Sequence, residues 1–329
     1  MKILITGGSG FIGSNFIRFL LEDSGEENLE ICNFDKLTYA GQGKNIGHMG
    51  LSHDPRYTFI RGDVSIREQV EHALDLFDPS VIVNFAAESH VDRSISNSMD
   101  FVTSNVSGTV NLLDVSIGKL EKFVQISTDE VYGSRKEGSF NEDDLLNPSS
   151  PYSASKAAAE QFAVAYHKTH SAPVIITRSS NNYGPFQLPE KLIPLFITNL
   201  IDGKKVPLMW SEDNPGLNVR DWIHVEDNCR AIWHILNHGK VGEVYNIPGN
   251  SELNNLEITR AILYYFGKGD EMIEHIPHRK GHDFRYSISG DKLADLGFKV
   301  DPGSFYKRLD ETCKWYEENQ SWWRPLKGK

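Results

Sequence analysis

The sequence has few cysteines, no long hydrophobic run and no excess of positive charge. Its three cysteines, Cys32, Cys229 and Cys313, are far apart and form neither a CxxC pair nor a zinc pattern, so we expect a reduced, cytoplasmic protein without a metal site. The net charge of −11 repels phosphate backbones and argues against nucleic acid as the main partner. The most apolar stretch, 192–201, falls short of the roughly 20 residues of a membrane span, and glycines interrupt the short apolar start, so neither a membrane association nor a signal peptide is predicted.

The remaining composition is typical of a globular protein. The chain has 329 residues, of which 39% are hydrophobic and 24% charged, which argues against disorder and fibrous repeats. Short β-rich runs alternate with helical patterns over the first half of the chain, an order that predicts a doubly wound parallel sheet, the Rossmann arrangement. The expected strands are 2–6, 30–34, 57–61, 81–85, 123–127 and 174–178, and the main helices are 15–21, 67–76, 101–120 and 154–169.

The pattern changes after about residue 178. Segment 181–194 is rich in proline and polar residues, segment 209–218 is loop-like, and the later elements are short and mixed. We therefore expect an α/β protein with a Rossmann domain over 1–180 and a smaller α+β substrate-binding domain over 181–329. Segments near 220–248 are the part of the second half that can return to the first domain.

A glycine-rich loop follows the first expected strand and opens the first helix. Gly7 permits a tight turn, Gly10 lets the backbone approach a pyrophosphate, and Gly13 lets the helix pack on the strand. The helix N-terminus then presents free N–H groups to the phosphates. Asp35, about 20 residues further on, is placed to accept both adenosine ribose hydroxyls, which favours NAD over NADP. The neighbouring Lys36 weakens that preference, and a purely structural glycine turn is the alternative.

Tyr152 and Lys156 are one helical turn apart at the start of the expected helix 154–169, so they share one face. A phenol is a poor base at neutral pH, but a nearby ammonium and a positive nicotinamide ring both lower its pKa. The pair is then able to take a proton from a substrate hydroxyl while hydride leaves the same carbon. An ordinary amphipathic turn is the alternative interpretation of YxxxK.

Thr128, Asp129 and Glu130 come directly after the expected strand 123–127, at the sheet edge where ligands bind. Thr128 is expected to hydrogen-bond the substrate hydroxyl beside Tyr152. The adjacent side chains of Asp129 and Glu130 must diverge, and two carboxyls aimed at different atoms suit an elimination, which needs one base and one acid. The alternative is a solvated acidic pair in a loop.

Five motifs together resemble a known family. TGGSGFIGS (6–14), NFAAESHVDRSI (84–95), STDEVYG (127–133), YSASK (152–156) and SNNYGPFQLPEKLIP (180–194) are similar to the dTDP-glucose 4,6-dehydratases of the extended short-chain dehydrogenase/reductase superfamily. The resemblance covers essentially the whole chain, and the Thr-Asp-Glu triplet is its most specific part. It implies bound NAD that is regenerated in each cycle. Tyr152, with Thr128 and Lys156, would take the sugar 4-OH proton, Glu130 the C5 proton, and Asp129 would protonate the leaving 6-OH.

The resemblance also implies contact residues. Ser104 stands where the family often has threonine, and Arg220 is expected to bind the diphosphate, with a local ion pair to Asp221 as the alternative. Expected cofactor contacts are Phe11, Ile12, Asp35, Lys36, Leu37, Thr38, Asp63, Val64, Ala86, Ala87, Ser89, Ser104, Tyr152, Lys156 and Asn182; expected nucleotide-sugar contacts are Ser89, His90, Thr128, Asn181, Glu190, Lys191, Leu192, Arg220, Asn255, His282 and Tyr286.

Some positions depart from the family pattern and leave the substrate open. Segment 210–215 replaces a shorter turn, Phe284 stands where arginine is usual, and Ser287 and Ser289 replace alanine and aspartate. A UDP-sugar 4,6-dehydratase, a UDP-sugar 4-epimerase and a non-catalytic NAD-binding module remain as alternatives, although an epimerase needs no C5 base. The resemblance further suggests a homodimer through helices near 101–118 and 154–168, whose apolar side chains are covered either by a partner or by the sheet.

Overall fold

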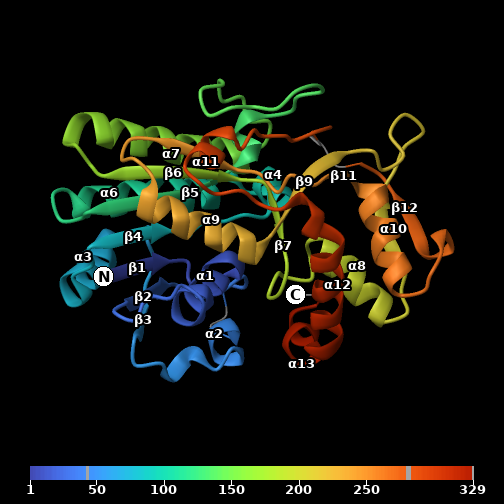
Figure 1. Cartoon of the computed structure of the whole chain (residues 1–329), viewed down its shortest axis with the longest axis horizontal. Helices are drawn as coiled ribbons and strands as arrows, with labels where there is room; N and C mark the ends of the chain where they lie inside the picture. The colour runs from blue at the N-terminus through green and yellow to red at the C-terminus, as the bar shows by residue number, and fades with distance from the viewer. Residues whose placement is uncertain (42–43, 279–282, 328–329) are drawn as a thin grey trace.

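A seven-stranded parallel sheet forms the centre of the molecule, in a computed structural model that describes residues 1–41, 44–278 and 283–327 (Figure 1). Its strand order is β10-β6-β5-β4-β1-β2-β3. The chain adds β2 and β3 on one side of β1 and then β4, β5 and β6 on the other side, while all the strands stay parallel. This order is the doubly wound arrangement, extended by β10 at one edge. The strands are β1 (Lys2–Thr6), β2 (Glu30–Asp35), β3 (Tyr57–Arg61), β4 (Val81–Asn84), β5 (Lys122–Thr128), β6 (Val174–Ser179) and β10 (Val244–Ile247).

Helices cover both faces of this sheet because side chains alternate along each strand. Ile3 and Ile5 of β1 lie in one core cluster with the apolar faces of α1 and α9, whereas Leu4 lies in a second cluster with α3, α6 and α7. The helices of both layers are labelled around the strands in Figure 1. Their bounds are α1 (Phe11–Glu22), α9 (Val225–His238), α3 (Arg67–Phe77), α6 (Gly108–Ser116) and α7 (Pro151–His170).

The second half of the chain adds a smaller α+β unit beside the sheet, with its own apolar core. It contains the small sheets β11-β9-β7 and β12-β8. The α/β fold class predicted from the sequence is confirmed. α9 and β10 pack with the first 180 residues, as the sequence allowed for segments near 220–248. The division of the chain into two domains at residue 180 stays a prediction for the remaining segments. The strands are β7 (Asn181–Tyr183), β8 (Val206–Met209), β9 (Val219–His224), β11 (Glu252–Asn254) and β12 (Ile273–Ile276); the helices are α8 (Leu192–Ile201), α10 (Asn255–Tyr265), α12 (Phe305–Glu318) and α13 (Gln320–Trp323).

The helix predicted over 101–120 is confirmed as far as Ser116, but its predicted end is wrong and the prediction missed a π-helical turn. The chain forms α5 (Ser98–Phe101), a π-helical turn η2 (Val102–Ser107) and then α6, which ends at Ser116. Ile117 leaves the helical conformation with ψ 123°, and Gly118 takes a left-handed φ of 72°, so the helix cannot continue to residue 120. The remaining short elements are α2 (Lys44–His48), η1 (Leu51–His53), α4 (Val91–Ser96), η3 (Asp129–Tyr132), η4 (Asp270–Met272), α11 (Asp291–Asp295), η5 (Pro302–Ser304) and η6 (Arg324–Leu326).

The apolar segment 192–201 forms α8, which is buried in the core of the second unit. Over the described ranges 1–41, 44–278 and 283–327, none of the helices combines the length and the apolar character that crossing a membrane requires.

Candidate active site

The glycine loop after β1 is folded as a close-packed cradle. Gly7 has φ 67°, and a Cβ atom there would lie 2.7 Å from the Ala86 amide nitrogen. A Cβ at Gly13 would lie 2.4 Å from the Gly7 carbonyl oxygen. Gly10 is the N-cap of α1 and provides no side-chain cap, so the first amides of α1 stay available to an anion. The loop therefore fits a pyrophosphate, as the glycine spacing predicts.

Asp35 ends β2 and lies almost fully buried beside this loop. Its Oδ2 accepts a hydrogen bond from the Ser9 amide at 3.0 Å, and its Oδ1 accepts one from the Leu37 amide at 2.7 Å. Burial raises the pKa of Asp35, while these two amides and Lys36 oppose the shift. Each carboxylate oxygen keeps a second lone pair. The side chain is thus held in place with acceptor capacity left for ribose hydroxyls.

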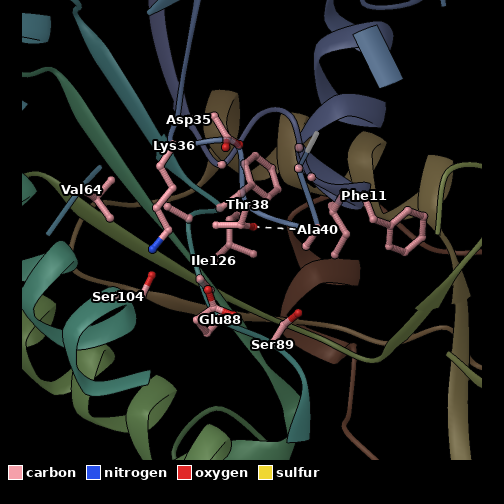
Figure 2. A pocket seen from close by; sticks show the side chains of 18 of the residues that line it. Phe11, Asp35, Lys36, Thr38, Ala40, Val64, Glu88, Ser89, Ser104 and Ile126 are labelled. Carbon is pink, nitrogen blue, oxygen red and sulfur yellow. Dashed lines mark hydrogen bonds between the residues drawn. The ribbon is translucent and has the colours of Figure 1, made fainter. Parts of the chain in front are cut away.

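A pocket runs from the glycine loop to the start of α7, and most of the expected cofactor residues line it. Figure 2 shows Asp35, Lys36 and Ser104 around this pocket. Leu37 and Asn182 do not line it; Leu37 instead holds Asp35 through its amide, and Asn182 donates to the Ser180 carbonyl at 3.0 Å. The expected residues that do line it are Gly7, Gly10, Phe11, Ile12, Gly13, Asp35, Lys36, Thr38, Asp63, Val64, Ala86, Ala87, Ser89, Ser104, Tyr152 and Lys156.

Sequence reasoning missed a further set of lining residues. Most of them are direct neighbours of expected residues at strand ends, so the strand pattern itself provides the signal that would find them. Gln187 and Leu188 are different, because they belong to the loop after β7 and reach the pocket only through the tertiary fold. The missed residues are Phe34, Tyr39, Ala40, Gly41, Gly62, Phe85, Glu88, Ile126, Ser127, Gln187 and Leu188.

Tyr152 and Lys156 lie on one face of α7, at the end of the pocket nearest β5. Ser150 caps this helix with a capping box, and Pro151 follows at its first position, which fixes where Tyr152 falls in the first turn. Lys156 is buried, and its Nζ donates to the Ile126 carbonyl at 2.5 Å. Burial lowers the pKa of Lys156 to about 8, and Glu160 opposes this shift.

The pKa of Tyr152 is raised rather than lowered by the protein itself. Burial is the main cause, the charges of Glu130 and Asp129 add to it, and a hydrogen bond with Thr128 opposes it. This direction is the opposite of what the Tyr–Lys spacing predicts. A positive charge placed beside the phenol by an oxidised nicotinamide ring has the sign needed to lower this pKa.

Asp129 and Glu130 begin the short helix η3 directly after β5. Asp129 is only 2% exposed, and its Oδ1 accepts a hydrogen bond from the Thr128 hydroxyl at 3.2 Å. Within the described part of the chain its Oδ2 has no hydrogen-bond partner. Burial raises the pKa of Asp129 well above its usual range, and the charges of Glu130 and Asp221 raise it further, against Arg220. A solvated loop is therefore excluded for Asp129, and its carboxyl is favoured in the protonated form.

Four of the expected substrate residues meet at the rim of the pocket. Glu190 accepts a hydrogen bond from the Tyr39 hydroxyl at 3.4 Å and lies 3.7 Å from His90 Nε2. Lys191 Nζ donates to the Ser89 carbonyl at 3.2 Å. Arg93, which the sequence did not single out, stacks 3.7 Å above the Tyr39 ring and approaches Glu190 at 3.8 Å.

Arg220 and Tyr286 form a second group next to η3. The Arg220 guanidinium lies 4.2 Å above the Tyr286 ring and donates to the Asp283 carbonyl at 3.0 Å. Asp221 is held separately, since it accepts from Ser180 Oγ and from the amides of Gly249 and Ser251, each at 2.7 Å. Arg220 and Asp221 are adjacent on β9 and thus belong to different networks.

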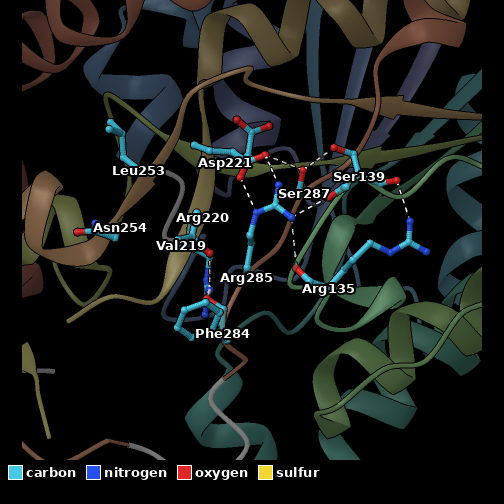
Figure 3. Close-up of polar contacts among 12 residues, drawn as sticks. Arg135, Ser139, Val219, Arg220, Asp221, Leu253, Asn254, Phe284, Arg285 and Ser287 are labelled. Carbon is cyan, nitrogen blue, oxygen red and sulfur yellow. Dashed lines mark hydrogen bonds and ion pairs between the residues drawn. The ribbon is translucent and has the colours of Figure 1, made fainter. Parts of the chain in front are cut away.

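The segment around Tyr286 is anchored by Arg285 (Figure 3). Arg285 donates to Glu252 at 2.7 and 2.8 Å and to the Gly138 carbonyl at 2.7 Å, and Ser287 donates to the same carboxylate at 2.7 Å. Of the other expected substrate residues, Asn181 carries an unpartnered buried Oδ1 within the described structure, Leu192 begins α8, Asn255 begins α10, and His282 lies outside the described residues.

The strand order, the glycine cradle after β1 and a Tyr–Lys pair one turn apart on α7 define an extended short-chain dehydrogenase/reductase. The chain belongs to the GDP-mannose 4,6 dehydratase family, whose model matches residues 4–296.

Individual relatives place it more narrowly. It is 46% identical to a dTDP-glucose 4,6-dehydratase of Streptomyces niveus, covering 100% of this chain and 96% of that protein. The dTDP-glucose 4,6-dehydratase DesIV of Streptomyces venezuelae, solved with NAD bound, superposes with a TM-score of 0.94 at 45% identity, over 99% of this chain and 100% of that one. A UDP-glucuronic acid 4-epimerase of Bacillus cereus shares the fold with a TM-score of 0.88 but only 27% identity, over 97% and 99% of the chains.

Proposed function

We propose that this protein catalyses the NAD-dependent dehydration of dTDP-glucose to dTDP-4-keto-6-deoxyglucose. The observation that carries the proposal is the state of Asp129. It is a buried carboxyl with a strongly raised pKa, and its Oδ2 has no hydrogen-bond partner among the described residues. It lies next to Glu130 in η3, the short helix that directly follows β5. An elimination needs such an acid beside a base, whereas a simple 4-epimerisation does not. The relatives at 45–46% identity are described as dTDP-glucose 4,6-dehydratases, which supports the same reaction.

The residues present fit a dinucleotide. The uncapped start of α1 and the cradle at Gly7 suit its pyrophosphate, and the buried carboxylate of Asp35 suits the adenosine ribose. NAD⁺ would accept hydride from the sugar C4 and return it to C6. Since a second phosphate on the ribose would meet the Asp35 carboxylate, we expect NAD rather than NADP.

Tyr152, Thr128 and Lys156 would handle the sugar 4-OH. Tyr152 would accept its proton, the Thr128 hydroxyl would orient it, and the Lys156 ammonium would stabilise the phenolate. Lys156 is held by the Ile126 carbonyl from the side of β5, so its charge stays close to the face that carries Tyr152.

The acidic pair would carry out the elimination. Oxidation at C4 acidifies the C5 proton, which Glu130 would remove as the general base. Asp129 would give a proton to the departing 6-OH as the general acid, because its pKa is raised. Return of the hydride to C6 and of a proton to C5 completes the 4-keto-6-deoxy sugar.

The diphosphate would be bound by Arg220, whose guanidinium is buried, stacked on Tyr286 and fixed by the Asp283 carbonyl. Phe284, at the position where the related sequences usually carry arginine, would leave Arg220 with more of the phosphate charge to balance.

Turnover of dTDP-glucose, UDP-glucose and UDP-GlcNAc by the purified protein tests the proposal, with products identified by mass and NMR. We expect loss of water from dTDP-glucose and a 4-keto-6-deoxy product. A 4-epimer of any of the three sugars would instead identify a 4-epimerase. The denatured protein should also release NAD(H), and activity that requires added NADP would overturn the role given to Asp35.

We also propose a cytoplasmic homodimer. Cys32, Cys229 and Cys313 are buried free thiols, which suits a reducing compartment. Met99, Val102 and Phe162 are 63%, 41% and 43% exposed on the helices that cover one face of the sheet, so they form an apolar surface for a second copy, while Leu113 faces the core. Light scattering should give twice the monomer mass, and Phe162→Glu should lower it.

A further inference from the structure

A buried ion pair lies directly behind the catalytic face of α7. Tyr152, Lys156 and Glu160 are spaced by four residues on this helix, so all three share one face. Glu160 is 0% exposed and Arg178 of β6 is 4% exposed. The Arg178 guanidinium donates hydrogen bonds to the Glu160 carboxylate, at 2.7 Å from Nη2 and at 3.0 and 3.2 Å from Nε.

The same arginine reaches the catalytic turn η3. Arg178 Nη1 donates to the Tyr132 hydroxyl at 2.5 Å, and its guanidinium lies 4.6 Å from the centre of the Tyr132 ring. Tyr132 in turn donates to Asn246 Oδ1 of β10 at 2.9 Å. Because Tyr132 ends the helix that Asp129 and Glu130 begin, one buried pair connects α7 with the acidic turn and with β10.

A buried ion pair of this kind contributes little net stability to a fold. Removing two charges from water costs about as much as their attraction returns, and apolar replacements of buried pairs are often neutral or better for stability. The position of the Glu160–Arg178 pair, one helical turn beyond Lys156, suggests a more specific role for the pair. The charged and titratable groups on the elements around Lys156 include Tyr152 and Glu160 of α7, Asp129, Glu130 and Tyr132 of η3 and, behind Glu160, Arg178 of β6. Among these, Glu160 is the charge that favours the ammonium form of Lys156 against burial.

We propose that Glu160, fixed by Arg178, is a positioning residue that keeps Lys156 charged and holds the acidic turn against α7. The inference rests on the proposed function for its kinetic consequence only. Glu160 does not line the pocket, whereas Lys156 does, so Glu160 acts through Lys156. Without its negative charge, the buried amine would lose its proton at lower pH.

Two variants test the proposal. Glu160→Gln removes the charge but leaves Arg178 unpaired in the interior, which can prevent folding. Glu160→Gln combined with Arg178→Met removes both charges and leaves no unpaired buried ion. Glu243→Gln is the matched control, because it breaks an exposed ion pair with Lys292 at 2.7 Å that involves neither Lys156 nor Arg178.

The direct measurement is competitive acylation of Lys156 by acetic anhydride as a function of pH, with the labelled peptide quantified by mass spectrometry. Only the neutral amine reacts, so the midpoint reports the proton on Lys156 whether or not dTDP-glucose is the substrate. We expect a midpoint near pH 8 in the wild type, a lower one in the Glu160 variants and no change in Glu243→Gln. Equal midpoints in the wild type and the folded double variant would overturn the proposal.

The kinetic measurement is kcat against pH with dTDP-glucose. Activity that needs the Lys156 ammonium is lost as pH rises through its pKa, so the alkaline limb should move to lower pH in the variants. A displacement of one pH unit corresponds to about a tenfold lower rate above both limbs and little change well below them. A purely structural role would lower the rate by the same factor at every pH. Wild-type protein that does not turn over dTDP-glucose would overturn the proposed function but leave the acylation result valid.

Discussion

Asp129 accepts a hydrogen bond from the Thr128 hydroxyl at 3.2 Å through Oδ1, while its buried Oδ2 has no partner among the described residues. A protonated carboxyl accepts on one oxygen and donates from the other. The threonine thus occupies the accepting oxygen and leaves Oδ2 as the donor. Such a donor is what the proposed role of Asp129 as the general acid requires.

Asp129→Asn should slow dehydration by about 10²–10⁴-fold, the usual worth of general-acid assistance. Oxidation at C4 should continue, so the absorbance of reduced nicotinamide should appear on mixing with dTDP-glucose. A substrate with fluoride in place of the 6-OH should recover much of the rate, because fluoride needs less help to leave. An equal defect with both substrates would contradict the role of Asp129.

Glu130→Gln should abolish exchange of the sugar C5 hydrogen with solvent deuterium, since an amide cannot take that proton. Reduced nicotinamide should still form, and dehydration should fall by about 10²–10⁴-fold. Glu137→Gln, an exposed carboxylate in the loop that follows η3, is the control and should exchange like the wild type. Normal exchange in Glu130→Gln would mean that another residue is the base.

Tyr152→Phe should lower kcat by about 10²–10⁴-fold with little change in KM, because the phenol acts mainly in the transition state. Reduced nicotinamide should not accumulate, which separates this variant from the two carboxyl variants. Tyr166→Phe is the matched control on the same helix, because the Tyr166 hydroxyl donates to the half-buried Asp114 and does not line the pocket. Loss of activity in both variants would indicate damage to α7 instead of loss of the base.

Asp129→Asn should also raise thermal stability at neutral pH. The pKa of Asp129 is raised by burial in the folded state, so stability falls as pH rises from about 3.9, the value in the unfolded chain, toward the folded value. The amide has no such dependence. Unfolding curves should give a Tm advantage for the variant at pH 7 that disappears near pH 4. A variant that is less stable than the wild type at pH 7 would contradict a raised pKa of Asp129 in the folded state.

Gly7→Ala should lose NAD. Its Cβ would lie 2.7 Å from the Ala86 amide nitrogen, and the backbone φ of 67° is strained for alanine. Gly118→Ala has the same kind of strain, with φ 72°, but no atom within 4 Å of its Cβ. Both variants should lose about 1–2 kcal/mol of stability from the backbone, and only Gly7→Ala should release less NAD(H) on denaturation. Equal NAD contents in Gly7→Ala and Gly118→Ala would contradict the role of the loop at Gly7 in binding the pyrophosphate.

Local features of the sequence were sufficient for much of this protein. The predicted strands end within one residue of the observed ones, because a short run of apolar and β-branched residues identifies a parallel strand without long-range information. The glycine spacing at 7, 10 and 13, the position of Asp35 and the four-residue step from Tyr152 to Lys156 are likewise short-range patterns. They are determined by backbone sterics and helix periodicity.

The tertiary structure decided what depends on contacts between distant segments. Glu190 contacts Tyr39, and Glu160 of α7 contacts Arg178 of β6, only because the fold brings separate segments of the chain together. The helix predicted over 101–120 contains a π-helical turn and ends before Gly118, which its hydrophobic pattern does not reveal. Above all, the charge states of Asp129, Tyr152 and Lys156 follow from burial and from neighbouring charges. A sequence identifies titratable groups, but desolvation, which sets their pKa values, exists only in the folded chain.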